Sequence, residues 1–569
     1  MKKSRLIVLL LLTLACGAAA LTSWSWFQKN KAFRAENAIA DIEVISAQRH
    51  SVAAPEQRML VCEYLQERLR GLGGLVEVHS YPGQQARGYE FDVHNIVADF
   101  PAPVYCCSSD DDDCCSKCCS SDDDDCCSKC CSSDDACCGG CSSKEAPYLM
   151  LVAHYDSRYP WVPVRDTTCS FGAADDGYGV AVILEEVRLA LQKRSEWKQN
   201  LRVLFTDAEE VGMVGMKCEY EYNRELFSNV GLLINVEARG PFGPALLFET
   251  SKGNEELLDL YEEACSPFTY SLTNVVYSIM PNFTDFTIVK DDIPGLNFST
   301  IADINHYHTS LDNFSFVNDK SIRHYGAQMS PIIEEYLCSD DYSDVDELRS
   351  DKDRSFFTIP LLGLWNFSKE GYLVLNLLIL ALLVIVLIIK RKDLLKSLKY
   401  ALVQLLGALG AFAAGELIAW LACLVTGASF KPFGVITGVM ADNVIMIVAA
   451  LLLVAVFAVS YSRSSKVELR LEGTLVLLGV LSIVLLAALG ENLFTLIPLG
   501  ATVISLLLWY FSNCKWVLLI GIALILLHAV SFLWALSMAL TIGAFGAVLL
   551  IACFDLFALS ALGRLFVEK

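Results

Sequence analysis

Apolar and polar positions divide the chain into two parts. From about 27 to 345, short apolar runs alternate with amphipathic stretches. From about 371 to 562, long apolar runs follow one another with few charges between them. A further apolar run, Leu6 to Leu21, comes directly after the basic segment Met1–Arg5. The pattern therefore predicts a globular domain attached to membrane-embedded helices.

Within the globular part, segments with strand-like and helix-like patterns alternate. Expected strands lie at 76–81, 94–100, 148–153, 201–206, 232–236 and 245–248. Expected helices lie at 35–49, 56–72, 177–192, 255–265 and 321–337. Such alternation predicts an α/β fold, with a mainly parallel mixed sheet sandwiched by helices.

The apolar runs predict eight membrane spans. They lie at 6–21, 371–389, 401–426, 443–461, 473–490, 493–511, 516–533 and 538–560. Basic residues at 2–5, 390–399 and 463–470 flank these runs, and the positive-inside rule places them in the cytoplasm. The globular part then lies on the other side of the membrane, in the periplasm or on the outer face of a bacterium, or in a eukaryotic lumen. The first run fits a signal anchor or a cleaved signal peptide, and we favour the anchor.

Composition sets the expected domain boundaries. They are 1–26 for the anchor or signal peptide, 27–345 for the globular domain, 346–370 for a linker and interfacial segment, and 371–569 for an all-α polytopic membrane domain with about seven transmembrane helices. The acidic residues Glu416, Asp442, Glu491 and Asp555 lie in or near the spans without evident cationic partners. We therefore expect the spans to anchor the chain or to bind a partner, rather than to transport.

An insert at 106–141 holds 13 of the 22 cysteines and ten aspartates, in a repeat of CCSSDDDDCCSK. A thiolate cluster or a set of disulfides is one interpretation. A low-complexity surface insertion is favoured, because adjacent Cys pairs make poor tetrahedral sites. The aspartates inflate the net charge of −21, and no nucleic-acid partner is implied.

Residues of metal-ligating type stand at the ends of the expected strands. His154 ends one strand, Glu209 and Glu210 follow another, and Glu237 ends a third. Sheets of this kind place their sites at the carboxyl ends of the strands. We therefore expect these side chains to meet, although each alone could be an ordinary charged residue at a strand exit.

Two further candidates come from loops. Asp175 precedes a helix and could bridge two cations, or simply cap the helix. His308 lies in a loop with His306, which competes for the same role on spacing alone. Asp156 could hold the second ring nitrogen of His154. The whole set suits two zinc ions that share an aspartate, with one free glutamate as a base.

Several segments resemble the motifs of one known family. AHYDS, GAADDGYG, DAEEVG, NVEARG and YHTSLDN look like those of the co-catalytic dizinc aminopeptidases of metallopeptidase family twenty-eight, and DFTIVKDDIPGL resembles the family's downstream substrate-side segment. The resemblance covers roughly 35–337. It implies that His154 and Glu237 hold one Zn2+ and that Glu210 and His308 hold the other.

The same resemblance assigns the remaining roles. Asp175 would bridge the two ions, Glu209 would be the general base, and Tyr307 could donate a hydrogen bond to the oxyanion. Glu237 stands where many secreted members have Asp, and it is similar to the endoplasmic-reticulum and vacuolar membrane members. Glutaminyl cyclases share the fold and a Glu here, but they use one zinc and lack a polytopic tail.

We therefore expect a membrane-anchored zinc metallopeptidase. It would remove N-terminal residues from peptides on the non-cytoplasmic side, by attack of a zinc-activated water. The alternatives are a single-zinc glutaminyl cyclase-like acyltransferase, a non-catalytic receptor-like ectodomain, and a transporter. The expected partners are peptide substrates and the lipid bilayer, and the sequence leaves oligomeric partners undetermined.

Overall fold

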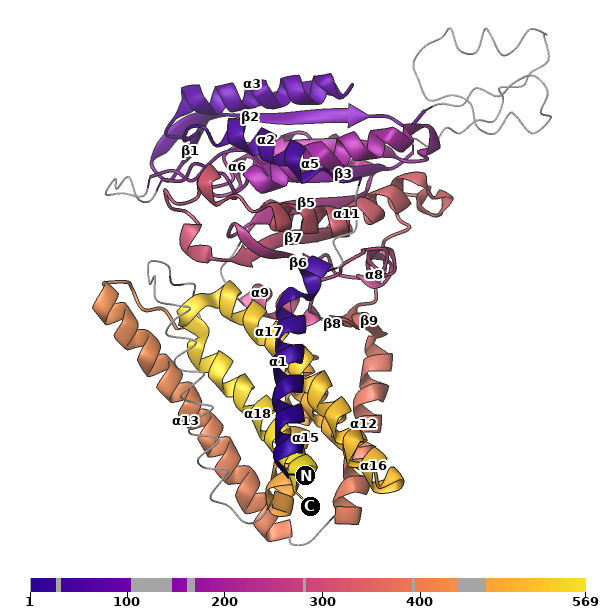
Figure 1. The fold of residues 1–569 in the computed structure, drawn as a ribbon. Helices are drawn as coiled ribbons and strands as arrows, with labels where there is room; N and C mark the ends of the chain where they lie inside the picture. The colour runs from indigo at the N-terminus through magenta and orange to yellow at the C-terminus, as the bar shows by residue number, and fades with distance from the viewer. Residues whose placement is uncertain are drawn as a thin grey trace, which may run out of the picture.

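The computed structural model describes residues 2–26, 32–103, 146–160, 169–279, 283–390, 394–432, 434, 436 and 467–568. The insert at 106–141, the expected span at 443–461, and the basic residues Arg463 and Lys466 lie outside the described residues. In the described part, a globular domain sits on one end of a bundle of long helices (Figure 1).

A seven-stranded sheet forms the centre of the globular domain, in the order β1-β2-β4-β3-β5-β7-β6. Its strands are β1 Leu75–Ala86, β2 Tyr89–Phe100, β3 Tyr148–His154, β4 Asn200–Thr206, β5 Val230–Ala238, β6 Phe242–Thr250 and β7 Gly295–Ala302. The four central strands pair in parallel, whereas β1, β2 and β6 pair antiparallel. The predicted mixed sheet is thus confirmed, and its parallel part is the centre. β3 is buried along its whole length, as expected for a parallel strand covered on both faces.

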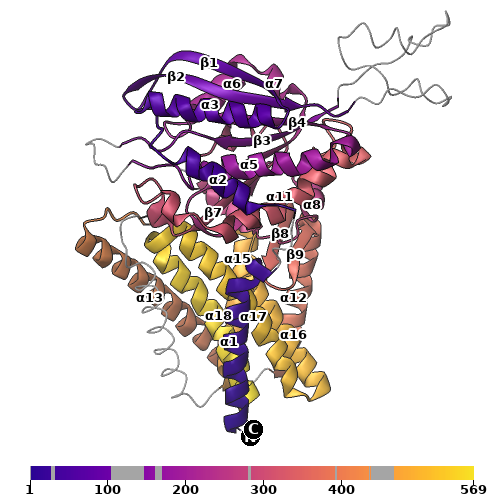
Figure 2. The same ribbon diagram turned by 45° about the horizontal axis from the view of Figure 1, so that its top comes forward.

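Helices cover both faces of this sheet. Alternate residues of β3 enter two separate apolar clusters: Leu149 and Leu151 join one, and Met150 and Val152 join the other. The first cluster includes α2 Ala35–Ile45, α3 Pro55–Gly71, α5 Gly177–Ala190, α8 Glu255–Tyr261 and α11 Asp319–Cys338. Figure 2 shows α3, α5 and α11 over this face. The second includes α6 Val214–Tyr222, α7 Glu225–Ser228 and α10 Phe286–Val289. The predicted sandwich is therefore present.

The observed elements differ from the expected ones in a few places. β1 and β2 form a hairpin longer than predicted, and β7 was not predicted at all. α2 ends at Ile45 instead of residue 49, and α8 ends at Tyr261 instead of residue 265. The segment expected to be a linker and interfacial stretch contains a second hairpin, β8 Arg354–Ile359 and β9 Gly363–Ser368.

The bundle contains long apolar helices from both ends of the chain. They are α1 Lys2–Trp26, α12 Lys369–Lys390, α13 Leu394–Thr426, α15 Val467–Leu489, α16 Leu493–Ser512, α17 Leu518–Leu540 and α18 Phe545–Val567. By length and composition, six segments of the described residues could cross a membrane. The last of these, Lys515–Val567, contains both α17 and α18.

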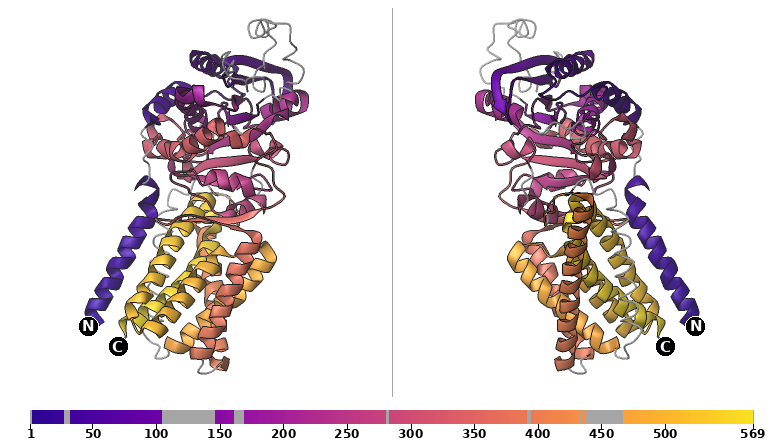
Figure 3. Two further views of the ribbon diagram at one scale, coloured as in Figure 1. Left: turned by 90° about the vertical axis from the view of Figure 1, so that its right-hand side faces the viewer. Right: turned by 90° about the vertical axis from the view of Figure 1, so that its left-hand side faces the viewer.

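The first helix belongs to the bundle. α1 packs along α17 and α18, and Arg5 Nη1 donates to the carbonyl oxygens of Phe566 at 3.0 Å and Glu568 at 3.3 Å. Both ends of the chain therefore lie at the end of the bundle that points away from the globular domain (Figure 3).

Polar contacts connect the globular domain to the bundle. Glu491, in the turn between α15 and α16, pairs with Lys369 Nζ at 2.9 Å and accepts from Ser355 Oγ at 2.7 Å. The expectation that Glu491 lacks a cationic partner was therefore wrong. Lys369, the first residue of α12, lies beside it. Tyr270 of the globular domain lies 3.0 Å from Ser531 of α17, hydroxyl to hydroxyl. Of the other acidic residues, Glu416 accepts from Gly546 N at 3.2 Å, whereas Asp442 lies outside the described residues.

Candidate metal centre

The candidate ligands meet at the carboxyl edge of the parallel strands. His154 is the last residue of β3, Glu210 follows β4, and Glu237 is the next-to-last residue of β5. Asp175 arrives from the loop before α5, and His308 from the loop after β7. Residues from five segments, far apart in sequence, are thus brought to one point.

Two groups of ligand atoms share Asp175. His154 Nε2 lies 3.3 Å from Asp175 Oδ1 and 3.7 Å from Glu237 Oε2. His308 Nε2 lies 3.3 Å from Asp175 Oδ2 and 3.1 Å from Glu210 Oε2. In each group the ligand atoms lie within 4.8 Å of one another. Asp175 therefore offers one oxygen to each group, which is the geometry of a bridging carboxylate.

The competing interpretations of two residues do not agree with the structure. His306 belongs to neither group: its Nδ1 lies 3.2 Å from Asp303 O, and its ring packs on Phe316. Asp176, and not Asp175, caps α5, because its carboxylate accepts from Gly179 N at 3.0 Å.

Several polar atoms of this centre are left without a hydrogen bond. Among the described residues, Asp175 Oδ2, Glu210 Oε1 and His308 Nε2 are buried and have no hydrogen-bond partner. Buried polar atoms are normally satisfied, so each such case requires an explanation. Imidazole nitrogens and carboxylate oxygens are zinc ligands. The residues present therefore fit a divalent cation in each group.

The electrostatics lead to the same conclusion. Burial raises the pKa of Glu237 to about 8, although the nearby His154 opposes the shift. Burial also raises the pKa of Glu209 well above its ordinary range, and the carboxylates of Glu237 and Asp285 add to it. So many carboxylates can share a buried site in charged form only beside cations.

Asp156 supports the centre in a way that differs in part from the prediction. Its carboxylate accepts from the amides of Glu209 at 2.8 Å and Glu210 at 3.4 Å. The closer acceptor for His154 Nδ1 is the main-chain carbonyl of Asp156, at 3.0 Å, while its carboxylate lies at 3.5 Å. The carboxylate thus mainly holds the loop after β4.

Sequence reasoning did not assign two other supporting residues. Asp312 accepts from Ala174 N at 2.7 Å and from Asp175 N at 3.3 Å, so it fixes the loop that carries Asp175. Arg158 Nη1 donates to Glu210 Oε2 at 2.8 Å and to its carbonyl at 2.9 Å. A charged residue in the histidine loop was the available signal for Asp312, and the sequence holds no comparable signal for Arg158.

A chain of buried amides holds Glu237. Asn235 Nδ2 donates to Glu237 Oε1 at 3.3 Å and to Asn297 Oδ1 at 3.0 Å. Asn297 Nδ2 donates to Glu249 Oε2 at 3.1 Å, and Lys290 pairs with the same carboxylate at 2.6 Å. An asparagine inside an otherwise apolar strand is costly unless it is hydrogen-bonded, and this signal was present in the sequence of β5.

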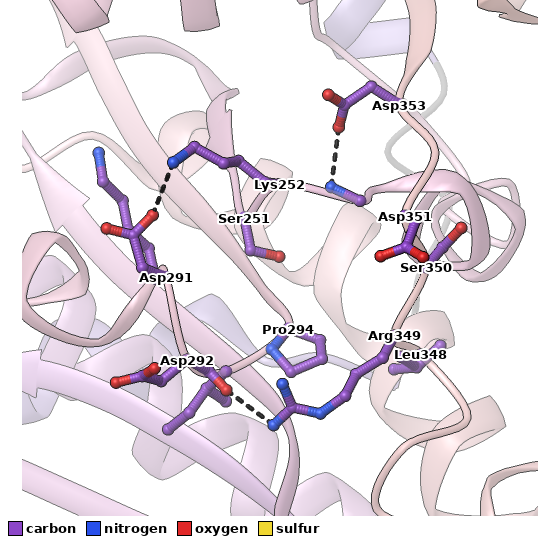
Figure 4. Close-up of a pocket in the computed structure, with 13 residues that line it drawn as sticks. Ser251, Lys252, Asp291, Asp292, Pro294, Leu348, Arg349, Ser350, Asp351 and Asp353 are labelled. Carbon is purple, nitrogen blue, oxygen red and sulfur yellow. Dashed lines mark hydrogen bonds and ion pairs between the residues drawn. The ribbon is translucent and has the colours of Figure 1, made fainter.

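A cavity of about 640 Å³ elsewhere on the domain contains none of these groups. Figure 4 shows two of its basic side chains, Lys252 and Arg349, bonded within the chain. Lys252 pairs with Asp291 at 3.0 Å, and Arg349 donates to the carbonyl of Asp292 at 2.7 Å. The candidate chemistry therefore lies at the strand ends and not in this cavity.

Comparisons with known proteins match this region. Residues 139–333 match the model of Peptidase family M28. The vacuolar membrane protease of Verticillium alfalfae is 30% identical over 181 residues, 31% of this chain and 16% of that protein. Endoplasmic reticulum metallopeptidase 1 of Mus musculus is 27% identical over 215 residues, 37% of this chain and 24% of that protein. The matched stretches thus span a quarter or less of these relatives.

Solved structures of similar fold are more distant in sequence. Porphyromonas gingivalis glutaminyl cyclase is 15% identical, with a TM-score of 0.38 over 54% of this chain and 100% of that chain. The aminopeptidase from Aneurinibacillus sp. strain AM-1 is 12% identical, with a TM-score of 0.39 over 55% of this chain and 97% of that chain.

The family match and the candidate centre coincide. The region 139–333 runs from just before β3 into α11, and it includes both ligand groups from His154 to His308. Residues 139–333 of this chain are therefore similar to peptidase family M28, and the chain continues into a bundle of apolar helices.

Proposed function

We propose that the globular domain is a dizinc exopeptidase that removes N-terminal residues from peptides. The observation that carries the proposal is the pair of ligand groups sharing Asp175. A one-zinc acyltransferase would need only one of these groups, and the second group of buried ligand-type side chains would then have no role. The names of the two relatives, a protease and a metallopeptidase, agree with peptide hydrolysis.

The proposed ligands divide between the two ions. His154 and Glu237 would hold one zinc, Glu210 and His308 the other, and Asp175 would bridge them. A pair of zinc ions at this point would lower the pKa of a water molecule and polarise the scissile carbonyl. The amides of Asn235 and the carboxylate of Asp312 keep the ligands in place.

Glu209 would move the proton. Its backbone is fixed by Asp156, and burial, together with nearby acidic groups, raises the pKa of its carboxylate. A carboxylate with a raised pKa accepts a proton from the attacking water and can return it to the leaving amine.

Tyr307 would bind the developing oxyanion. Burial keeps the pKa of its hydroxyl well above the ordinary value, and Asp175 and Glu210 add to that shift, so the hydroxyl remains a donor. Its ring stacks on His308, with centroids 3.6 Å apart. The donor is therefore held beside the second ligand group, where charge would develop.

We also propose that the domain faces the non-cytoplasmic side of the membrane. The basic flanks of the spans support this orientation, and both chain ends lie at the far end of the bundle (Figure 3). Protease added to the cytoplasmic side of sealed vesicles should leave the domain intact, and its digestion there would contradict the orientation.

Substitution of the proposed base tests the function. Glu209→Gln keeps size and hydrogen bonding but removes the proton acceptor, so peptide hydrolysis should fall by at least about 100-fold, with zinc content unchanged. Glu67→Gln, on the exposed side of α3, is the matched control and should keep full activity. Full activity of Glu209→Gln would overturn its assigned role, and loss of zinc would place Glu209 among the ligands instead.

A further inference from the structure

Arg239 stands at the edge of the candidate centre, just beyond the end of β5. It lies two residues after Glu237, and residues two apart on a strand point to the same face. Its amide donates to the carbonyl of Thr300 at 2.9 Å and to Ser299 Oγ at 3.2 Å, both on β7. The backbone of Arg239 is therefore fixed by the neighbouring strand, and its side chain projects on the side of the ligand groups.

The guanidinium of Arg239 lies over the ring of Tyr307, with Cζ 5.6 Å from the ring centroid. The same ring stacks on His308. The cation is thus one aromatic ring away from a proposed zinc ligand, beside the proposed oxyanion donor. Arg239 is only partly buried, so a ligand in the site can reach it.

This cation has no acidic partner within the described part of the chain. The carboxylate of Glu237 is engaged elsewhere, because Oε1 accepts from Asn235 and Oε2 faces His154. The other guanidinium of the centre, that of Arg158, is committed to Glu210. Among the described residues, Arg239 contributes only the contact with Tyr307 and its backbone bonds. A half-buried guanidinium of this kind is suited to bind an anion from outside the chain.

We propose that Arg239 binds a carboxylate of the peptide substrate close to the scissile bond, so that the enzyme prefers short acidic peptides. The inference rests on the proposed peptidase function. Because Tyr307 would contact the reacting carbonyl, an anion on Arg239 lies within about one residue of that bond. Two carboxylates of a peptide meet this condition: the side chain of an acidic first residue, and the C-terminus of a dipeptide.

Paired substrates separate these two sources. The full-length, zinc-loaded protein in detergent is assayed with Asp-Ala-amide against Asn-Ala-amide, and with Ala-Ala against Ala-Ala-amide. Each pair differs only in one carboxylate replaced by an amide. The wild type should favour the acid in one pair, and that pair identifies the source of the carboxylate.

Arg239→Gln should reduce that preference, as the ratio of kcat/KM values, by roughly 10- to 100-fold, the usual worth of a charge-assisted hydrogen bond. Arg239→Lys keeps the charge and should keep part of the preference. Arg70→Gln, an exposed arginine that contacts Gln66, should leave the ratio unchanged. A purely structural role in supporting Tyr307 would lower both members of a pair equally.

Two outcomes overturn the inference. They are no acid preference in the wild type, and an unchanged acid-to-amide ratio in Arg239→Gln, whether or not both rates fall. If the wild type cleaves none of the peptides, the proposed function fails first. Calorimetric titration of wild type and Arg239→Gln with the same four peptides then decides, because binding of the acids that does not depend on Arg239 also rejects the inference.

Discussion

His308 and Ala208 adopt left-handed backbone conformations, with φ of 58° and 59°. Residues other than glycine adopt this region at a cost of about 1–3 kcal/mol, and they do so mostly where the surroundings hold them. Here the turn at Ala208 directs the two glutamates after β4 toward the centre, and the turn at His308 does the same for its imidazole. Two of the strained backbone positions therefore lie where the ligand groups are assembled.

Away from the centre, the partly buried His79 and the buried Glu219 form an ion pair whose strength should depend on pH. His79 Nδ1 lies 2.5 Å from Glu219 Oε1, and Asn95 and Asn223 donate to the same carboxylate. The bond to Glu219 raises the pKa of His79, and the pKa of Glu219 is lowered, since these bonds outweigh its burial.

The sign of the effect follows from both shifts. The contribution of His79 is complete below its ordinary pKa of 6.5 and is lost as pH rises through the raised value. The contribution of Glu219 is complete above 4.5 and is lost as pH falls through the lowered value. His79→Gln should therefore cost about 1 kcal/mol at pH 6 and clearly less at pH 9, measured by thermal unfolding.

The control is His94→Gln. His94 contacts Ser80 at 2.9 Å, and burial lowers its pKa. Its replacement should therefore cost no more stability at pH 6 than at pH 9. An equal loss at both pH values for His79→Gln would contradict the charge-based account.

Single residues were predictable where the strand pattern fixed their place. His154 and Glu237 end apolar strands, so the pattern placed them at the correct edge. Spacing could not choose between His306 and His308, because the choice depends on the backbone turn at His308. The sequence predicted no role for Arg239, because a charged residue after a strand is common. Only the three-dimensional structure shows that its guanidinium has no acidic partner among the described residues.

At the scale of elements, the site depends on how tightly the loop before α5 is folded. Gly177 begins α5, and its amide donates to Gly172 O at 3.0 Å. A Cβ at Gly177 would lie 2.6 Å from that same carbonyl oxygen, which is part of the backbone and cannot move without moving the loop. This loop carries Asp175.

Gly177→Ala should therefore displace the carboxylate of Asp175, the proposed bridge. Zinc affinity should fall by at least about tenfold, in the range seen when groups that orient metal ligands are changed; competition with a chelator measures it. Gly71→Ala, where a Cβ would meet nothing within 4 Å, is the matched control and should leave affinity unchanged. Normal zinc affinity in Gly177→Ala would show that the loop tolerates the shift.

The elements were predicted where burial was strong and missed where it was not. β3, β4 and β5 are mostly apolar, and each was placed correctly. β7 was not predicted, because its apolar pattern is interrupted by the polar residues Asn297, Ser299 and Thr300. The fold nevertheless buries all three. The residues of β1 are exposed or only partly buried. The strand is therefore held by its pairing with β2 more than by burial, and its full length leaves little signal in the apolar pattern.

At the scale of the whole molecule, the globular domain and the bundle are joined by specific contacts. The β8–β9 hairpin lies between the two parts (Figure 1), and Ser355 of β8 donates to Glu491 of the bundle. The Tyr270–Ser531 hydrogen bond also crosses the boundary. The long apolar runs predicted the bundle, because membrane-spanning length leaves a strong signal. They could not predict the contacts between the globular domain and the bundle, because these contacts depend on polar residues that are far apart in sequence.

The central claim is that one centre in this molecule holds two zinc ions. The most direct measurement is the zinc content of the purified full-length chain, by mass spectrometry of the metal after loosely bound ions are removed. The account predicts two zinc ions per chain. One zinc per chain would contradict the shared role of Asp175 and favour a single-zinc acyltransferase, and no zinc would contradict the metal centre altogether.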